Sequence, residues 1–157
     1  MKKHILTTLL LFTNALLLAQ TYVYNGNSNF INDLMCTVED GKVYDGNSNF
    51  RQDILYNVKD GKVYKGNMNF LKDIVVTIRD GKIYRGNSFF QGDIVFNIQN
   101  NTIYNGNSIS SFDIIARIED GKVYKGNSRF RGDIVFNFDG ELTTEEFVAV
   151  WLTVFEN

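Results

Sequence analysis

Residues 53–66 read Asp-Ile-Leu-Tyr-Asn-Val-Lys-Asp-Gly-Lys-Val-Tyr-Lys-Gly, and this stretch decides the fold. Two runs rich in β-branched and aromatic residues flank the dipeptide Asp60-Gly61. A type I′ turn needs positive φ at both of its central residues, which Asp and Gly tolerate. The stretch therefore predicts a β-hairpin in which Asn57 faces Tyr64.

Strand alternation assigns the side chains of this hairpin to two faces. Ile54, Tyr56, Val58 and Val63 are predicted to share the face that forms the core. The equivalent residues in other units are Ile94, Phe96, Ile98 and Ile103, and Ile134, Phe136 and Phe138. The opposite face carries the tyrosine beside a polar residue, where a ring can cover apolar surface while its hydroxyl stays in water.

The hairpin belongs to a repeat of 20 residues that runs without an insertion. The repeated tyrosines, each followed two residues later by Gly-Asn, are Tyr24, Tyr44, Tyr64, Tyr84, Tyr104 and Tyr124. Aspartates with the same spacing are Asp33, Asp53, Asp73, Asp93, Asp113 and Asp133. Such strict recurrence within one chain indicates that the units are structurally equivalent.

The two ends of the array are complementary halves of one unit. Residues 21–26 match only the second strand of the hairpin, and residues 133–138 match only the first. If these halves pair, the strands close into a ring and leave no exposed edge. We therefore predict an all-β closed ring of hairpins, with an open solenoid as the alternative. Five complete hairpins and two halves leave five-fold and six-fold closure open.

A second connection, such as residues 46–53, joins each hairpin to the next. Its Gly, Asn, Ser and Asp residues favour turns, because these side chains bond neighbouring backbone amides. We expect one aromatic residue in each connection to anchor it to the core, namely Phe30, Phe50, Phe70, Phe90 and Phe130. In the fifth unit Ser110 replaces this residue, and Phe112 restores an aromatic on the same side if the segment is extended.

The N-terminus has the pattern of a secretory signal peptide. Lys2 and Lys3 precede a mostly apolar run over residues 5–18, and Ala19 offers a small residue for cleavage. The run is short for a membrane span, although an uncleaved anchor is the alternative. We therefore predict that residues 1–20 are removed, that no membrane span remains, and that the protein is secreted or periplasmic.

The remaining chain divides into a repeat domain, residues 21–142, and a C-terminal helix, residues 143–157. Thr143 and Glu146 form a capping box. Apolar residues recur at helical spacing after it: Phe147, Val150, Trp151, Val154 and Phe155. This pattern predicts one buried face, so the helix should pack on the repeats as a lid or plug. Docking to a partner or lying on a membrane surface is the alternative, although a membrane-surface helix would carry Lys or Arg on its polar face and this one has none.

Charge and cysteine content exclude some classes of function. Loss of Lys2 and Lys3 with the signal peptide changes the net charge from −2 to −4. Such a chain lacks the basic footprint that nucleic acids require, so no nucleic-acid partner is expected. Cys36 is the only cysteine and has no intramolecular mate. Its place on an apolar strand predicts a buried, inert thiol.

Enzymatic and metal chemistry find little support in the sequence. The only histidine is His4, within the signal peptide, which removes histidine-based catalysis and histidine metal sites from the mature chain. No phosphate-binding loop occurs, and no cofactor is predicted. Residues 45–56 imitate an EF-hand loop, but Phe50 stands where glycine is needed and Tyr56 where glutamate is needed. The structural role of turn residues is therefore preferred to calcium binding.

An acid-dependent hydrolase is the remaining enzymatic alternative, because a glycosidase needs only two carboxylates. The six repeated aspartates look like six copies of one structural part, whereas a catalytic pair must have two different environments. Acids outside the repeat pattern are Asp45, Glu141, Glu145, Glu146 and Glu156. We predict that the protein is not an enzyme and has no catalytic or metal-binding residues.

The leading hypothesis is therefore a non-enzymatic binding or structural module. The alternative within binding is a multivalent, lectin-like module, in which repeated tyrosines beside Asn or Thr offer shallow glycan sites. The residues that would bind ligand are Tyr44, Tyr64, Tyr84, Tyr104 and Tyr124. The expected partner is a glycan or a cell-envelope protein.

Three segments resemble a known family. They are Asp-Gly-Lys-Val-Tyr-Lys-Gly-Asn-Ser (120–128), Gly-Asp-Ile-Val-Phe-Asn (132–137) and the ending Leu-Thr-Thr-Glu-Glu-Phe-Val-Ala-Val-Trp (142–151). Over residues 21–157 the chain resembles the five-fold β-flower proteins, which are exported bacterial proteins. The resemblance implies a radial arrangement of hairpins and brings no activity or site residue. A second similarity is to membrane occupation and recognition nexus repeats, whose period is longer.

Overall fold

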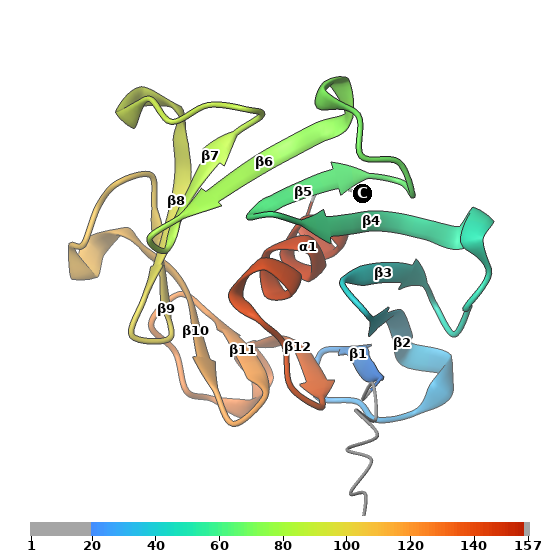
Figure 1. Cartoon of the computed structure of the whole chain (residues 1–157). Helices are drawn as coiled ribbons and strands as arrows, with labels where there is room; N and C mark the ends of the chain where they lie inside the picture. Colours follow the sequence, from blue (N-terminus) through green and yellow to red (C-terminus); the bar gives the residue numbers. More distant parts are fainter. Residues whose placement is uncertain (1–19, 156–157) are drawn as a thin grey trace, which may run out of the picture.

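The first and last strands of the chain pair with each other and close the ring. The computed structural model describes residues 20–155, in which twelve antiparallel strands form one closed barrel (Figure 1). β1 pairs with β2 on one side and β12 on the other, with Tyr24 opposite Asn137. The predicted closed ring is confirmed, and it has six units, because the two half units together make the sixth. The predicted signal peptide lies outside the described residues except for Gln20.

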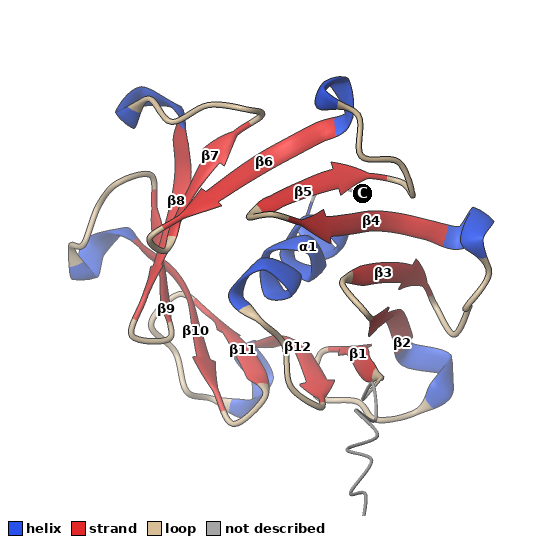
Figure 2. Cartoon of the chain, viewed as in Figure 1, coloured by secondary structure: helices blue, strands red, loops and turns tan. Residues whose placement is uncertain are grey.

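Each strand is joined to the next by a short connection, so strand order follows the sequence (Figure 2). The strands are β1 (Thr21–Asn25), β2 (Leu34–Glu39), β3 (Lys42–Asp45), β4 (Ile54–Lys59), β5 (Lys62–Lys65), β6 (Ile74–Arg79), β7 (Lys82–Arg85), β8 (Ile94–Gln99), β9 (Thr102–Asn105), β10 (Ile114–Glu119), β11 (Lys122–Lys125) and β12 (Ile134–Asp139). The turns after β2, β4, β6, β8 and β10 lie at one end of the barrel, which we call the turn end. The longer connections leave the strands at the opposite end, the loop end.

The hairpin register is the one that turn chemistry predicts. Asn57 lies opposite Tyr64, and Val58 lies opposite Val63. Asp60 and Gly61 have φ of 52° and 69°, so both central residues occupy the left-handed region that a type I′ turn requires. The other four turns have the same positive φ at both positions.

A β-bulge at the start of each even-numbered strand, β2 to β12, changes which residues reach the core. On β4, Ile54 pairs with Tyr44 but Tyr56 pairs with Val43, so Leu55 is the extra residue. Leu55 and Tyr56 both pack in the core cluster, whereas Ile54 lies on the outer face beside Tyr44. The prediction that Ile54, Ile94 and Ile134 belong to the core face is therefore wrong. The bulge shifts the alternation by one residue after each of them.

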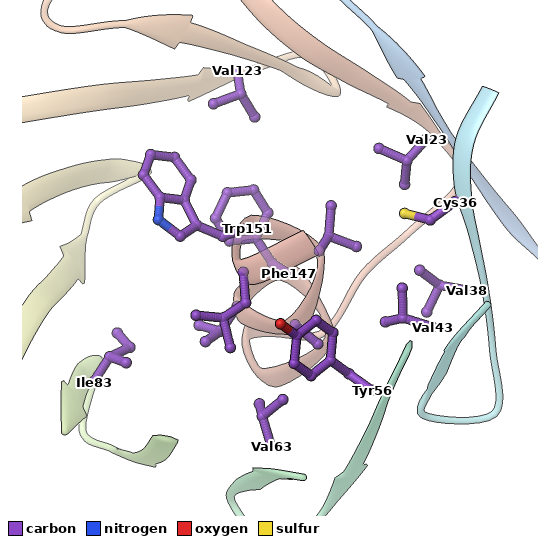
Figure 3. Close-up of a cluster of buried hydrophobic side chains, with 14 of the residues drawn as sticks. Val23, Cys36, Val38, Val43, Tyr56, Val63, Ile83, Val123, Phe147 and Trp151 are labelled. Carbon is purple, nitrogen blue, oxygen red and sulfur yellow. The ribbon is translucent and has the colours of Figure 1, made fainter. Parts of the chain in front are cut away.

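The C-terminal helix α1 (Thr144–Phe155) lies inside the ring (Figure 1). Every residue from Phe147 to Thr153 is buried, and Figure 3 shows strand side chains pointing at the helix from several sides. The predicted plug is correct, but the prediction of a single buried face is wrong. A helix enclosed by strands must be apolar all round. The helix is too short to span a membrane, and no other described helix is long enough.

Hydrogen bonds fix the start of α1 at the turn end. The Thr143 hydroxyl accepts a bond from the Glu146 amide at 3.2 Å, and the Glu146 carboxylate accepts one from the Thr143 amide at 2.9 Å. These two bonds make the predicted capping box. Glu146 also accepts a bond from the Gly41 amide in the turn after β2. The helix therefore enters at the turn end, and its last residue, Phe155, reaches the loop end.

Candidate functional site

The repeated tyrosines lie on the outer face of the barrel. Tyr44, Tyr64 and Tyr84 are buried, with exposed fractions of 9, 7 and 8%. Tyr104 and Tyr124 are half-buried. Each pairs across its hairpin with the predicted polar residue. Ligand binding by these tyrosines stays a prediction.

The polar residue beside each tyrosine holds the neighbouring connection. Thr37 and Thr77 donate their hydroxyl hydrogens to the carbonyls of Gly46 and Gly86 at 2.7 and 2.8 Å. Asn97 donates from its amide nitrogen to the carbonyls of Gly106 and Ser108. These bonds draw the start of each connection against the outer face, so the connections fold outward and partly back over the strands.

The repeated aspartates have one structural role, as predicted. In five connections a serine hydroxyl donates to the aspartate five residues later, and the pairs are Ser28–Asp33, Ser48–Asp53, Ser88–Asp93, Ser108–Asp113 and Ser128–Asp133. The same serine oxygen accepts a bond from the amide two residues on, for example that of Phe50 at 3.1 Å. Met68 replaces the serine in the third unit. Within residues 20–155, no three His, Cys, Asp or Glu side chains gather closely enough to hold a metal ion.

Phenylalanine side chains project into solvent from each of the six connections. We call the connections, residues 26–33, 46–53, 66–73, 86–93, 106–113 and 126–133, the loop crown. Its exposed phenylalanines are Phe30, Phe50, Phe70, Phe89, Phe90, Phe112 and Phe130, with exposed fractions from 52 to 96%. Figure 2 shows the short 3₁₀ turns that follow them around the outside of the ring.

The prediction that these phenylalanines anchor the connections to the core is wrong, because their side chains are exposed. Backbone bonds hold all six connections, serine–aspartate bonds hold five of them, and α1 already occupies the interior of the barrel. Phe112 lies in a 3₁₀ turn, Ser111–Asp113, and not in an extended segment, and it is 96% exposed. One signal of this outcome was present in the sequence, because Phe50 and Phe130 stand among polar residues without the alternation of a buried strand.

The outer face carries a depression beside Tyr44. It has a volume of about 420 Å³ and is lined by Lys42, Tyr44, Asn49, Arg51, Ile54 and Asn67. Two cations, two amides and one aromatic ring therefore converge next to Phe50 of the loop crown. These groups can donate hydrogen bonds to hydroxyl or carboxylate oxygens.

A third feature lies inside the barrel at the loop end. Two cavities of about 430 and 470 Å³ flank the contacting rings of Trp151 and Phe155. Arg85 lines the first cavity and Lys125 the second. The last residues of β1, β3, β5, β7, β9 and β11 are all exposed and each pairs with an inward-facing residue of the neighbouring strand: Asn25, Asp45, Lys65, Arg85, Asn105 and Lys125. Sequence reasoning did not predict these cavities.

Cys36 lies in the core opposite Asp45. Its side chain is fully buried, and burial, with a smaller contribution from the negative charge of Asp45, raises the pKa of the thiol from 9.0 to about 12. The prediction of a buried thiol is confirmed.

Native protein should react with a thiol-specific disulfide reagent at pH 8 far more slowly than unfolded protein. The raised pKa lowers the thiolate fraction roughly a thousandfold. The neutral thiol favours the folded state, so this contribution is complete below pH 9.0 and is lost as pH rises towards 12. Unfolding of wild type and Cys36→Ala between pH 8 and 11 measures it, and wild type should lose more stability. Equal labelling rates for native and unfolded chains would contradict the assignment.

A family model supplies the decisive comparison. The model described as "6-fold beta flower protein" matches residues 23–151, which span the repeats and most of α1. The chain belongs to this family. The expected beta-flower resemblance is thus correct in kind and wrong in its five-fold count, because β12 and β1 build the sixth unit. No curated protein and no solved structure matches the chain.

Membership of the 6-fold beta flower family fits a non-enzymatic repeat scaffold. The family brings no activity or site residue to this chain. Any function must therefore be argued from the loop crown, the outer depression and the mouth of the barrel.

Proposed function

We propose that this beta flower protein is an exported, non-enzymatic scaffold that binds a cell-envelope glycan at several loop-crown sites at once. The observation that carries the proposal is a ring of exposed phenylalanines, in which Phe30, Phe50, Phe70, Phe90 and Phe130 hold the equivalent position of five units and Phe112 lies two residues further on in the remaining unit. Exposed apolar residues that adjoin one another, as Phe70 and Leu71 or Phe89 and Phe90 do, form the kind of apolar patch that marks an interaction surface.

The surroundings of the crown phenylalanines favour a glycan over an apolar partner. An aromatic ring packs on the apolar face of a sugar, while neighbouring amides and cations bond its hydroxyls. Beside Phe50, the depression offers Asn49, Asn67 and Arg51 for this purpose. Its two cations favour an acidic sugar, since charge-assisted hydrogen bonds are the stronger ones. In the first three units an asparagine directly precedes the crown phenylalanine, as in Asn49-Phe50, which places an amide near the ring.

Repetition around a ring explains how shallow sites could give useful affinity. Each site has little buried surface, and a single one would bind weakly. A polymer that engages several sites converts later contacts into intramolecular ones, which can raise avidity by about 10² to 10⁴. The variation between units, such as Ser110 and Met68, argues for several tolerant sites in place of one exact site.

The test measures binding of the mature chain to a glycan array and to acidic polysaccharide beads. Phe50→Ser alone should weaken binding only a few-fold, whereas Phe50→Ser, Phe90→Ser and Phe130→Ser together should weaken it about a hundredfold, because contacts in a multivalent complex multiply. Tyr44→Phe reports separately on the tyrosine hydroxyl of the predicted site.

The matched control is Lys59→Ser with Gln99→Ser, which changes exposed residues at the turn end. This variant should bind like the wild type. Binding of the triple variant at wild-type strength, or binding of wild type to phospholipid vesicles but to no glycan, would overturn the proposal. Turnover of a glycan by the protein, abolished in Asp45→Asn, would instead support the hydrolase alternative.

A further inference from the structure

The two cavities at the mouth of the barrel are bounded by one aromatic pair. The rings of Trp151 and Phe155 are in contact, with centroids 4.2 Å apart and planes inclined by 38°. One cavity lies between this pair and β6–β8, and its wall includes Val75, Val76 and Phe96. The other lies between the pair and β10–β12, and its wall includes Ile115, Ala116 and Val135. Their volumes, about 430 and 470 Å³, fall in the range of small-molecule sites.

The cavities exist because α1 is off-centre and two wall residues are small. The helix packs against β2–β5, which leaves space on the opposite side. Tyr56, Phe96 and Phe136 occupy the equivalent inward position in three units, but Val76 and Ala116 occupy it beside the cavities. A phenylalanine at either position would fill the adjacent space. The inward position thus alternates between small residues, Cys36, Val76 and Ala116, and aromatic ones, and two of the small residues line the cavities.

Solvent reaches the apolar wall from the loop end. Ile115 lines one cavity and is 36% exposed, and Phe155 is 49% exposed at the mouth. Covering an apolar wall that is in contact with water lowers the free energy of the system, so binding of an apolar group there is favourable. The open mouth gives such a group a route of access without unfolding.

Positive charge stands at the entrance of each cavity. Arg85 lines the first cavity and Lys125 the second. Lys65 occupies the equivalent position in the third unit, and Asp45 is the single acid of this ring of residues. Within the described part of the chain neither Arg85 nor Lys125 forms an ion pair. Each is therefore a cation at the edge of an apolar cavity.

We propose that the mouth of the barrel binds single-chain amphiphiles with an anionic head, such as a fatty-acid carboxylate. The alkyl chain lies in a cavity against Trp151, Val76 or Ala116, and the carboxylate pairs with Arg85 or Lys125. An apolar lining with one charged group at its edge selects this chemistry, because a neutral alkane gains nothing from the cation and a cationic amphiphile is repelled by it. The site is separate from the loop crown and does not depend on glycan binding.

Trp151 is the only tryptophan in the chain, so its fluorescence reports directly on the site. Dodecanoate, titrated below its micelle concentration, should give a saturable change in Trp151 emission. Dodecyltrimethylammonium, with the same alkyl chain and the opposite charge, should bind at least tenfold more weakly. Arg85→Gln with Lys125→Gln should weaken dodecanoate binding at least tenfold and remove the discrimination between the two amphiphiles.

The repeat supplies matched variants that close the cavities. Val76→Phe and Ala116→Phe place at these positions the residue that Phe96 and Phe136 already provide in equivalent units, so the barrel should fold. The double variant should unfold at a temperature equal to or above that of wild type and should lose the saturable response to dodecanoate. It should keep glycan binding, which separates failure of this site from failure of the proposed function.

Three results would overturn the inference. The first is wild-type dodecanoate affinity in the folded Val76→Phe, Ala116→Phe variant. The second is equal affinity for the anionic and cationic amphiphiles. The third is loss of dodecanoate binding on replacement of the crown phenylalanines Phe50, Phe90 and Phe130 with serine, which would place the amphiphile on the outer surface.

Discussion

A chain that ends at Glu141 is expected to lose its cooperative unfolding transition. Without α1, the inward side chains of the strands face an empty interior. Five large apolar residues of the helix, Phe147, Val148, Val150, Trp151 and Leu152, are buried, and at about 2 kcal/mol each their loss removes roughly 10 kcal/mol. Small domains are stable by only about 5–15 kcal/mol, so the ring should not survive. Thermal unfolding followed by circular dichroism measures the effect.

Phe155→Ala is the control for this truncation. Phe155 belongs to the same helix and contacts Trp151, but it is 49% exposed, so its replacement should lower stability by only about 1 kcal/mol. Addition of a peptide covering residues 142–157 to the truncated chain should restore part of the folded signal. A truncated chain with a sharp transition near that of the full protein would show that the strands form a stable ring without the helix.

Gly140→Ala is expected to destabilise the protein by about 3 kcal/mol, since strain at a Gly-only backbone conformation alone costs about 1–3 kcal/mol. Gly140 has φ of 127° and lies where the chain leaves β12 for the helix. A Cβ atom there would overlap Thr21 Oγ1 and lie 3.2 Å from Thr21 Cβ. Thr21 is buried and donates a hydrogen bond to the Glu141 carbonyl at 2.9 Å, so it has little room to move.

Gly46→Ala separates backbone strain from the contact with Thr21. Gly46 also has positive φ, 51°, but a Cβ atom there meets nothing within 4 Å. Its replacement should cost about 1 kcal/mol, the strain contribution alone. Denaturant unfolding of both variants gives the comparison, and equal losses would show that the seam between β1 and β12 tolerates the added methyl group.

The parts of the fold that depend on local chemistry were predictable. Asp60-Gly61 fixes its hairpin through the φ values that its two residues tolerate, and the pairing of Asn57 with Tyr64 follows from that turn alone. Closure of the ring was also readable, because the half units at the two ends complement each other. The capping box of Thr143 and Glu146 likewise involves residues three positions apart.

The errors arose where distant parts of the chain decide the outcome. Ile54 leaves the core because the bulge at Leu55 adjusts the strand to its curved ring, which no single hairpin reveals. The crown phenylalanine Phe50 is exposed because α1 has taken the interior. The sequence did contain a signal for the enclosed helix: Phe147 to Leu152 are six consecutive apolar residues, more than one buried face needs.

The candidate sites were less predictable than the fold. The depression beside Tyr44 combines residues from two connections and two strands, so it exists only once the loop crown folds back on the outer face. The mouth cavities depend on how far α1 lies from each wall. Ala116 was the visible clue, because it is the smallest residue at a position that is aromatic in three other units.

The seam has a consequence for how the protein is made. The side-chain amide of Asn137, on β12, donates a hydrogen bond to the Gly26 carbonyl, which follows β1 and is 111 residues away in the sequence. β1 therefore cannot complete its pairing until β12 has been synthesised. Contacts of such long range form slowly. A nascent chain that lacks β12 and α1 has an unpaired β1 and an empty barrel interior. The full free energy of folding is available only after both elements have been made. Until β12 is made, such a chain therefore stays unfolded.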